Sequence, residues 1–262
     1  MPVRKRFGQH FLHDPAVIRR IVDAVAPAPG ERIVEIGPGR GALTWPLLER
    51  AGKLTVIELD RDLARALRSD ERAAGLTVHV GDVLRSDLAV LAGTGQGALR
   101  VIGNLPYNIS TPLLFHLLEQ RAGIADMMFM LQKEVVDRMG ARPGSKQYGR
   151  LTVMLAAAAE VEPLFEIGPG AFQPRPKVWS AIVRLRPSNT PRFEMGRPGA
   201  LAAVAAAAFS QRRKTLRNSL RSLLAPEQIE ACGIDPQRRP ETLEPAEFGR
   251  LAAQYSRSVG YT

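Results

Sequence analysis

The segment Asn104–Ser110, which reads Asn-Leu-Pro-Tyr-Asn-Ile-Ser, has residue types suited to holding a flat base that bears an exocyclic amine. The side-chain oxygen of Asn104 and the backbone carbonyl of Leu105 can both accept hydrogen bonds from an NH2 group. Pro106 lacks a backbone donor and fixes its φ angle, which helps to aim the two acceptors. The ring of Tyr107 can stack on the base. The segment alone therefore predicts a clamp for an amine-bearing base and leaves the identity of the base open.

A glycine-rich turn, Gly37-Pro38-Gly39-Arg40-Gly41, follows the first expected strand. Glycines at this position let the backbone turn tightly and approach a ligand at the start of the next helix. The third glycine comes one residue earlier than in the dinucleotide fingerprint G-x-G-x-x-G. This spacing disfavours a nicotinamide or flavin dinucleotide and predicts that Gly37 and Gly39 contact a different ligand.

Two acidic residues, Glu58 and Asp82, end the second and third expected strands. A carboxylate at the end of the second strand can accept both ribose hydroxyls of an adenosine, and Asp82 is placed to accept from the adenine amino group. Either acid alone is more typical of a solvated charge, but acids at successive strand ends favour a binding site. Beside an amine clamp they indicate S-adenosylmethionine, whose sulfonium carries an electrophilic methyl group, so that no metal is required. Catalysis would then come from orientation and from stabilisation of the developing positive charge.

Short apolar runs alternate with helical patterns through the first 186 residues, which predicts an α/β fold with a mostly parallel, Rossmann-like sheet. The expected strands are Arg32–Ile36, Leu54–Leu59, Leu76–Val80, Leu99–Gly103, Asp126–Leu131 and Ser180–Arg186. The expected helices among them are Pro15–Ala26, with Asp14 as its N-cap, Ala42–Ala51, Arg61–Ser69 and Pro112–Leu118. A Pro- and Gly-rich linker, Pro187–Gly199, precedes three more helix candidates, which are Ala200–Leu224, Pro226–Cys232 and Pro245–Tyr255. We therefore expect a methyltransferase domain of residues 1–187 and a small all-α domain of residues 188–262.

The chain has 262 residues, 45% of them hydrophobic, and a formal net charge of +10. This charge favours a polyanionic partner, nucleic acid first and an anionic membrane second, although a generally basic surface would explain it too. Because no apolar run approaches 18 residues and the N-terminus lacks an apolar core, neither a spanning helix nor a secretory signal is expected. The single cysteine, Cys232, excludes an internal disulfide, and His10 and His13 lack the further ligands that a metal site needs. A cytoplasmic monomer is the expectation.

Methylation of a base amine in a nucleic acid would require the base to leave its stack and enter a pocket, and we expect Tyr107 and Phe172 to form the aromatic walls. Core packing is an equal alternative for Phe172. Most of the affinity for a nucleic acid should come from phosphate contacts. The cations expected to make them are Arg212, Arg213, Lys214, Arg217 and Arg221. Three of these, Arg213, Arg217 and Arg221, would form one stripe of a helix, which could equally be a solvated face.

Taken together, these motifs show that the chain resembles the small-subunit (16S) ribosomal RNA adenine N6-dimethyltransferases of the KsgA type. The matching strings run almost the length of the chain and are Arg4–Leu12, Glu35–Thr44, Val56–Asp60, Gly103–Pro112, Met130–Val136, Tyr148–Leu151, Phe172–Val178 and Gln211–Leu220. A minor departure is His10, where the family often has Asn.

The resemblance implies that S-adenosylmethionine is the cofactor and that His10 and Leu12 line its methionine end. It implies that Gly37 contacts the cofactor backbone, Glu58 its ribose and Asp82 its adenine, with Asn104 between the cofactor and the target amine. It also implies the activity of the family, which is the addition of two methyl groups to each of two adjacent adenines in a hairpin near the 3′ end of small-subunit rRNA, and a role in assembly of that subunit.

Three other functions stay open from the sequence. The first is methylation of an adenine in large-subunit rRNA, of the kind that confers antibiotic resistance; the run Phe209–Leu220 favours the small-subunit type. The second is a non-catalytic assembly factor on the same scaffold, against which the intact Glu58, Asp82 and Asn104 argue. The third, a nucleotide-dependent oxidoreductase, is disfavoured by the glycine spacing.

Overall fold

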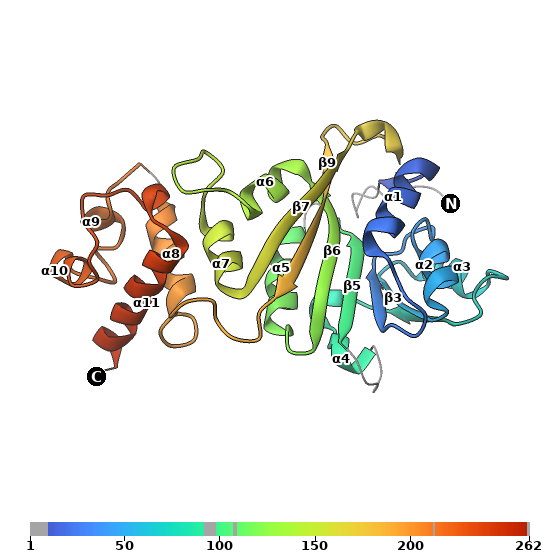
Figure 1. Ribbon diagram of the computed structural model, residues 1–262, viewed down its shortest axis with the longest axis horizontal. Coiled ribbons are helices and arrows are strands. Elements are labelled where there is room, and N and C mark those ends of the chain that lie inside the picture. Colours follow the sequence, from blue (N-terminus) through green and yellow to red (C-terminus); the bar gives the residue numbers. More distant parts are fainter. Residues whose placement is uncertain (1–9, 92–97, 107–108, 212, 261–262) are drawn as a thin grey trace. The chain divides into compact units, whose positions relative to one another are not determined.

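The computed structural model describes residues 10–91, 98–106, 109–211 and 213–260, and these form two compact units (Figure 1). The first unit consists of Met1–Val136 and Glu162–Pro187, and the second of Asp137–Val161 and Ser188–Thr262. The second unit therefore contains a segment, Asp137–Val161, that the sequence places in the methyltransferase domain. The change of unit at residue 187 coincides with the expected start of the linker.

The first unit is built on a seven-stranded sheet with the strand order β4-β3-β2-β5-β6-β9-β7. The bounds are β2 (Ile33–Ile36), β3 (Leu54–Glu58), β4 (Leu76–Val80), β5 (Leu99–Asn104), β6 (Ile124–Gln132), β9 (Ser180–Pro187) and β7 (Ala159–Ile167), whose first three residues belong to the second unit. The pairs from β4 through β6 are parallel, whereas β9 runs antiparallel to β6. The α/β fold is confirmed, and each predicted strand is present within about two residues.

The helical segments described in the first unit follow the strands. They are α1 (Pro15–Val25), α2 (Thr44–Ala51), α3 (Arg61–Arg68), the 3-10 turn η2 (Val83–Arg85), α4 (Leu88–Leu91), α5 (Ser110–Glu119) and α6 (Lys133–Met139), whose last turn belongs to the second unit. Helix α1 begins as the sequence predicts, because the carboxylate of Asp14 accepts hydrogen bonds from the backbone of Ala16 and Val17 at 2.8 and 3.2 Å.

One face of the sheet carries a continuous apolar core beneath α1 and α2. Ile21 of α1 and Leu47 of α2 are buried there with strand residues such as Val56, Ile102 and Met130. The strand residues of this core recur at every second position, so that their neighbours point to the opposite face. Because both faces of a parallel sheet are covered, its strands read as short, nearly unbroken apolar runs, which is why the sequence revealed them.

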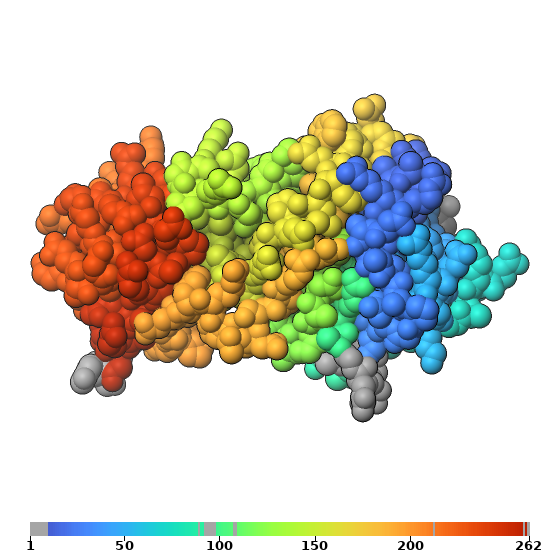
Figure 2. All heavy atoms as spheres, in the orientation of Figure 1, coloured from blue at the N-terminus to red at the C-terminus, as the bar shows by residue number. Residues whose placement is uncertain are grey.

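A two-stranded antiparallel ribbon joins distant parts of the first unit. Strand β1 (Phe11–Leu12) pairs with β8 (Phe172–Gln173), which follows the 3-10 turn η3 (Pro169–Ala171). The backbone N–H of His13 continues the contact by donating to the carbonyl of Ala171 at 3.0 Å. Figure 2 shows the yellow segment around β8 at the surface beside the blue segment of α1. The ribbon was not predicted, because two-residue strands leave no periodic pattern.

The second unit is helical. Its elements are α7 (Arg150–Ala158), α8 (Ala200–Ser210), α9 (Leu216–Ser219), α10 (Pro226–Glu230), the 3-10 turn η4 (Pro240–Thr242) and α11 (Pro245–Val259). Their common core includes Val153 of α7, Val204 of α8 and Leu251 of α11, all fully buried. The rings of Phe209 and Phe248 stack with centroids 5.4 Å apart. Since α7 buries its apolar side in this core, Asp137–Val161 belongs to the second unit.

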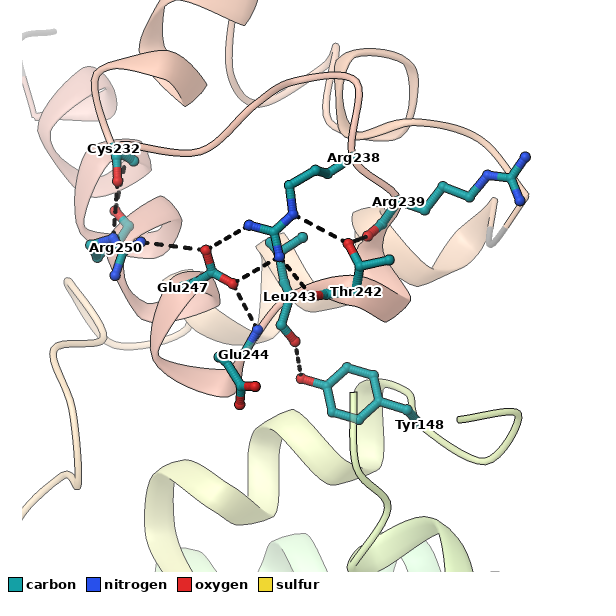
Figure 3. A network of polar contacts seen from close by, with 9 residues as sticks. All are labelled: Tyr148, Cys232, Arg238, Arg239, Thr242, Leu243, Glu244, Glu247 and Arg250. Atoms are coloured by element: carbon teal, nitrogen blue, oxygen red, sulfur yellow. Dashed lines mark hydrogen bonds and ion pairs between the residues drawn. The ribbon is translucent and has the colours of Figure 1, made fainter. Parts of the chain in front are cut away.

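A polar network fixes the entry to α11 (Figure 3). The carboxylate of Glu247 accepts hydrogen bonds from both terminal nitrogens of Arg238, at 2.8 and 3.1 Å, and from the backbone N–H of Glu244 at 2.8 Å. The buried hydroxyl of Tyr148, which precedes α7, donates to the carbonyl of Leu243 at 2.7 Å. Tyr148 therefore binds the 137–161 segment to the C-terminal helices by a hydrogen bond in addition to apolar contact.

The predicted long helix Ala200–Leu224 is wrong. Helix α8 ends at Ser210, and only the short α9 follows, after Thr215 in an extended conformation. The backbone N–H groups of Leu216 and Arg217 donate to the carbonyls of Arg238 and Pro236, at 2.8 and 2.9 Å. Because these carbonyls already satisfy the first turn of α9, the helix restarts there instead of continuing from α8.

No helix in the described part of the chain combines the length and apolar content needed to cross a membrane. The described His, Cys, Asp and Glu side chains form no group of three that could hold a metal ion. The half-buried thiol of Cys232 donates to the carbonyl of Gln228 at 3.3 Å.

We expect the ion pairs of Arg100 on β5 to be the main electrostatic contribution to the stability of the sheet. Arg100 donates twice to Asp126 on β6, at 2.7 and 3.0 Å, and once to Glu31 at 2.9 Å. The Arg100 and Asp126 side chains are only 15% and 16% exposed. Arg100→Ala leaves Asp126 with only its longer contact to Arg184, at 3.7 Å, and should lower the free energy of unfolding by about 3 kcal/mol in urea titrations.

The matched control is Arg50→Ala on α2, which removes an ion pair with Asp23 whose side chains are 43% and 64% exposed. Its effect should stay below about 0.5 kcal/mol, because exposed pairs contribute little. Equal losses for the two variants would contradict the importance of burial at Arg100.

Candidate functional site

A cavity lies at the edge of the sheet where the parallel strands β2, β3, β4 and β5 end. It is lined by residues that follow these four strands together with residues of β1. Those expected from the sequence are His10, Leu12, Gly37, Gly39, Glu58, Asp82, Asn104 and Leu105. The structure therefore brings the glycine turn, both acids and the described part of the amine clamp into one cavity.

The glycine turn has a backbone that other residues adopt only with strain. Gly37 and Gly39 have φ angles of 67° and 59°, in the left-handed region. A Cβ atom on Gly39 would also lie 3.2 Å from the ring of Phe11, which packs over the turn from β1. The turn is held from beneath, since the N–H of Gly37 donates to the carbonyl of Ile57 at 2.9 Å. These glycines therefore leave the cavity wall as bare backbone.

Glu58, the last residue of β3, presents a carboxylate in a fixed orientation. One of its oxygens accepts from the N–H of Gly39 at 3.0 Å and the other from the N–H of Asp60 at 2.9 Å. Burial raises the pKa of Glu58, and these backbone hydrogen bonds offset part of the increase. Each carboxylate oxygen keeps a lone pair for a ligand hydroxyl, so the geometry suits a vicinal diol.

Asp82 follows β4 and caps η2, where its Oδ1 accepts from the N–H of Leu84 at 3.0 Å. The apolar neighbours of the two acids also line the cavity, namely Leu59, with 51% of its surface exposed, and Val83, with 6%. Sequence reasoning missed Leu59 and Val83, because an apolar residue beside a strand end looks like core. A large exposed leucine in a cavity is suited to cover one face of a flat ring.

Asn104 ends β5, and its amide has a defined orientation. Nδ2 donates to the backbone carbonyl of His10 at 3.3 Å, which leaves Oδ1 as the acceptor of the planar group. His10 is held in turn, since its Nδ1 donates to the carbonyl of Pro174 at 2.7 Å. The next residue, Leu105, has its side chain buried and its N–H bonded to the carbonyl of Met130 at 3.2 Å. These bonds hold the Asn104 amide and the Leu105 backbone in place, and with them the two acceptors that the sequence predicted.

Glu35 is a further cavity residue that sequence reasoning passed over. It lies within β2, is only 2% exposed, and accepts a hydrogen bond from the hydroxyl of Thr44 at 2.6 Å. Burial raises the pKa of Glu35 to about 7; the nearby charge of Glu58 adds to the increase, and the bond from Thr44 opposes it. A charged residue type inside an otherwise apolar strand was the available signal.

The charge of the cavity favours a cationic ligand. Four acidic residues are among its described lining residues, Glu35, Glu58, Asp60 and Asp82, together with the single arginine Arg40, which lies over the ring of Phe11. These acids would repel the pyrophosphate of a dinucleotide. The nucleotide-dependent oxidoreductase is therefore disfavoured by the electrostatics as well as by the glycine spacing.

Comparisons with known proteins agree with this geometry. The profile of the family described as ribosomal RNA adenine dimethylase matches residues 2–256. The chain belongs to this family. Curated relatives include the ribosomal RNA small subunit methyltransferase A of Pseudomonas aeruginosa, 53% identical over 98% of this chain and 96% of that protein. The protein of the same name in Xylella fastidiosa strain 9a5c is 54% identical over 96% of this chain and 95% of its own length.

Two solved structures share the fold. A dimethyladenosine transferase from Plasmodium falciparum superimposes with a TM-score of 0.78 at 24% identity, over 95% of this chain and 98% of that one. The 23S rRNA methyltransferase ErmE superimposes with a TM-score of 0.70 at 26% identity, over 94% of this chain and 99% of that one. The resemblance inferred from the motifs is thus confirmed, and the dimethylase is an S-adenosylmethionine-dependent methyltransferase.

The cavity of the dimethylase fits that cofactor on its own chemistry. S-adenosylmethionine carries a sulfonium and an ammonium group against one carboxylate, and the acidic lining complements this net positive charge. The fixed carboxylate of Glu58 suits the ribose, and the bare backbone at Gly37 and Gly39 allows close approach. The lining residues of the cavity therefore match the cofactor that the family uses.

The sequence predicts that Phe172 and Tyr107 form the aromatic walls of the base pocket. Phe172 is only 2% exposed and packs in the core with α1 and α2, and it does not line the cavity. A stacking wall needs a free ring face, so the position of Phe172 corrects that prediction in favour of core packing. Tyr107 lies outside the described residues.

The basic residues expected to bind RNA belong to the second unit of the dimethylase. Arg213, Lys214, Arg217 and Arg221 are all exposed, and Arg212 lies outside the described residues. They do not form the predicted stripe, because only Arg217 is helical and the others lie in the turns before and after α9. They nevertheless remain close in sequence on a solvent-accessible segment without an intervening acid.

The buried Glu35 should make the stability of the dimethylase depend on pH. Its pKa is raised to about 7, so folding favours its neutral form; the resulting stabilisation is present below the ordinary Glu pKa and is lost as the pH rises through 7. Glu35→Gln is neutral throughout and can still accept from Thr44. Between pH 4.5 and pH 8, the free energy of unfolding should fall by about 3 kcal/mol less in this variant than in the wild type. Urea unfolding at the two pH values measures this difference.

Glu49→Gln, at an exposed position of α2, is the control and should follow the wild type at both pH values. If Glu35→Gln also followed the wild type, Glu35 would not be the group responsible for the pH dependence.

Proposed function

We propose that the protein transfers two methyl groups from S-adenosylmethionine to the N6 nitrogen of each of two adjacent adenosines near the 3′ end of small-subunit rRNA. The target lies in a hairpin, and the protein acts as a cytoplasmic monomer on an assembling subunit. The observation that carries the proposal is the meeting of Asn104 and Leu105 with Glu58 and Asp82 in one cavity. An amine clamp beside an adenosine site supports transfer from a methyl donor to an adenine amine.

In this proposal each cavity residue has one task in holding the cofactor. Glu58 accepts from the ribose hydroxyls and Asp82 from the adenine amine, while Leu59 and Val83 cover the adenine ring. The residues proposed for the methionine end are His10, Leu12, Gly37 and Gly39, with Glu35 supplying negative charge toward its cationic groups. When bound, S-adenosylmethionine supplies an electrophilic methyl group on sulfur.

The residues of the clamp act on the nucleophile. Asn104 Oδ1 and the Leu105 carbonyl accept hydrogen bonds from the adenine amine and hold its nitrogen toward the cofactor side of the cavity. As that nitrogen becomes positively charged, both bonds strengthen, which stabilises the transition state more than the ground state. Neither acceptor is basic enough to keep the proton at neutral pH, so the proton passes to solvent once the methyl is attached.

The small-subunit target is favoured over the large-subunit one by the relatives. Proteins named for the small subunit are 53–54% identical over more than nine-tenths of the chain, whereas the 23S rRNA methyltransferase ErmE is 26% identical. The complete set of Glu58, Asp82 and Asn104 supports an active enzyme over an assembly factor that has lost its chemistry.

The decisive experiment incubates the protein with methyl-labelled S-adenosylmethionine and small subunits that lack the modification. Label should appear in dimethyladenosine of the small-subunit rRNA. Asn104→Ala should lower the rate about a hundredfold, because one of two acceptors of the developing charge is lost. Calorimetric affinity for the cofactor should change by less than about threefold, since Glu58 and Asp82 hold most of it.

Label found only in large-subunit rRNA, or absent altogether, would overturn the proposal. Retained turnover by Asn104→Ala would instead remove Asn104 from the catalytic role and leave the assigned reaction intact.

We expect RNA binding to weaken steeply with salt through the cations of the second unit. Replacing Arg213 and Arg217 together by Gln should make the slope of log K against log salt shallower by about 1.8, since each lost phosphate contact removes about 0.9. Binding of unmodified small subunits at several salt concentrations measures this slope. Arg65→Gln, an exposed arginine of α3 beside Asp62, should leave the slope unchanged. An unchanged slope in the double variant would place the phosphate contacts elsewhere.

A further inference from the structure

Trp179 is an exposed tryptophan that the proposed chemistry does not use. It directly precedes β9, and 53% of its surface is exposed, next to Val178 at 42%. Large apolar side chains are exposed at few positions of the described chain, and Val178 and Trp179 are two of them in succession. Exposed apolar groups that lie together commonly mark an interaction site.

The sheet places Trp179 at the same edge as the cavity. Strand β9 is antiparallel to β6, with Ser180 opposite Gln132, so the start of β9 lies where β6 ends. Strand β6 in turn runs parallel to β5, with Met130 opposite Asn104. Trp179 is therefore two strands across from Asn104, about 10 Å at the usual strand spacing, and about three residues further along the strand direction, which adds about 10 Å at right angles, so that the two positions are about 14 Å apart. Nucleotides that flank the target base on the same RNA strand can cover this span.

The tryptophan is held in position at its backbone and at its ring. Its carbonyl accepts from the N–H of Lys133 at 2.9 Å. The six-membered end of the indole lies against Gly168, where a Cβ atom would be 3.7 and 3.8 Å from two ring carbons. A ring braced in this way loses little conformational entropy when a ligand stacks on its free surface.

The surroundings of Trp179 are basic. Arg175 and Lys177 are exposed in the same loop, and the nearby Glu166 is paired with Lys133 at 3.1 Å. The loop is also tied to the cavity, because the carbonyl of Pro174 accepts from His10. Cations interleaved with an exposed aromatic ring are the pattern of a surface that binds single-stranded nucleic acid.

We propose that the 175–179 loop binds the RNA strand next to the target adenine, with Trp179 stacking on a neighbouring base and Arg175 and Lys177 contacting its phosphates. The inference deepens the proposed function and rests on it. Unpaired RNA at this position helps to keep the target base out of its helix, since the neighbouring base gains a stacking partner on the protein.

Steady-state kinetics with unmodified small subunits provide the first test. Trp179→Ala should raise KM for the subunit about tenfold and leave kcat within about twofold, because stacking on a neighbouring base contributes equally to ground and transition states. Trp179→Phe should restore KM to within about threefold of the wild type. The control Val90→Ala removes an exposed apolar side chain on α4, and KM should not change.

Ultraviolet cross-linking of the wild-type protein to the same subunits identifies the occupant. Trypsin releases the peptide Val178–Arg184, in which Trp179 is the one aromatic residue, and this peptide should carry a nucleotide of the small-subunit rRNA. A raised KM with cross-links to a ribosomal protein alone would overturn the RNA assignment. An unchanged KM in Trp179→Ala would overturn the inference outright.

The two proposals fail in different ways. Wild-type protein that labels large-subunit RNA alone would refute the proposed target, whereas Trp179 would still be expected to cross-link to that RNA. If the wild type is active on the small subunit and Trp179→Ala has an unchanged KM, the loop contact is refuted and the proposed function stands.

Discussion

The parallel alignment of β2, β3, β4 and β5 is the constraint on which the site depends. Because these strands end at one edge, the alignment of the strands alone brings together the residues that follow them. Hydrogen bonds extend the ladder past the strand ends, from Gly37 to Ile57 and from Gly81 to Glu58, at 2.9 and 3.1 Å. A slip of one residue in β3 would turn Glu58 to the other face of the sheet, so the register of the apolar core also sets the binding site.

The acidic character of the cavity explains why burial and binding are coupled there. Glu35 and Glu58 are buried carboxyl groups at which desolvation raises the pKa. Their hydrogen bonds, from Thr44 to one and from the N–H groups of Gly39 and Asp60 to the other, recover only part of that cost. A cationic ligand supplies the missing favourable interaction. The cavity is therefore electrostatically complementary to a sulfonium cofactor in advance of binding.

The sequence was sufficient wherever one physical rule determined the outcome. Buried parallel strands are continuous apolar runs, and strand order alone places Glu58 and Asp82 at the site. It was insufficient where partners are distant in the chain. The ribbon of β1 and β8 is too short for a periodic pattern, and β7 carries the glutamates and proline of an edge strand. Phe172 is an aromatic residue that could equally be core or pocket, and the Glu35–Thr44 pair forms only when the helix after the glycine turn packs on its strand.

Within the proposed function, the two acceptors of the clamp also bear on where the reaction stops. An adenine amine brings two N–H donors to Asn104 and Leu105, the monomethylated amine brings one, and the dimethylated amine brings none. The second transfer therefore relies on a single hydrogen bond, and the product leaves both carbonyl oxygens without their partner. Polar groups that a bound product covers without pairing are costly. The same pair that orients the substrate thereby disfavours the product, so release follows from the chemistry of the amine and needs no separate device in the fold.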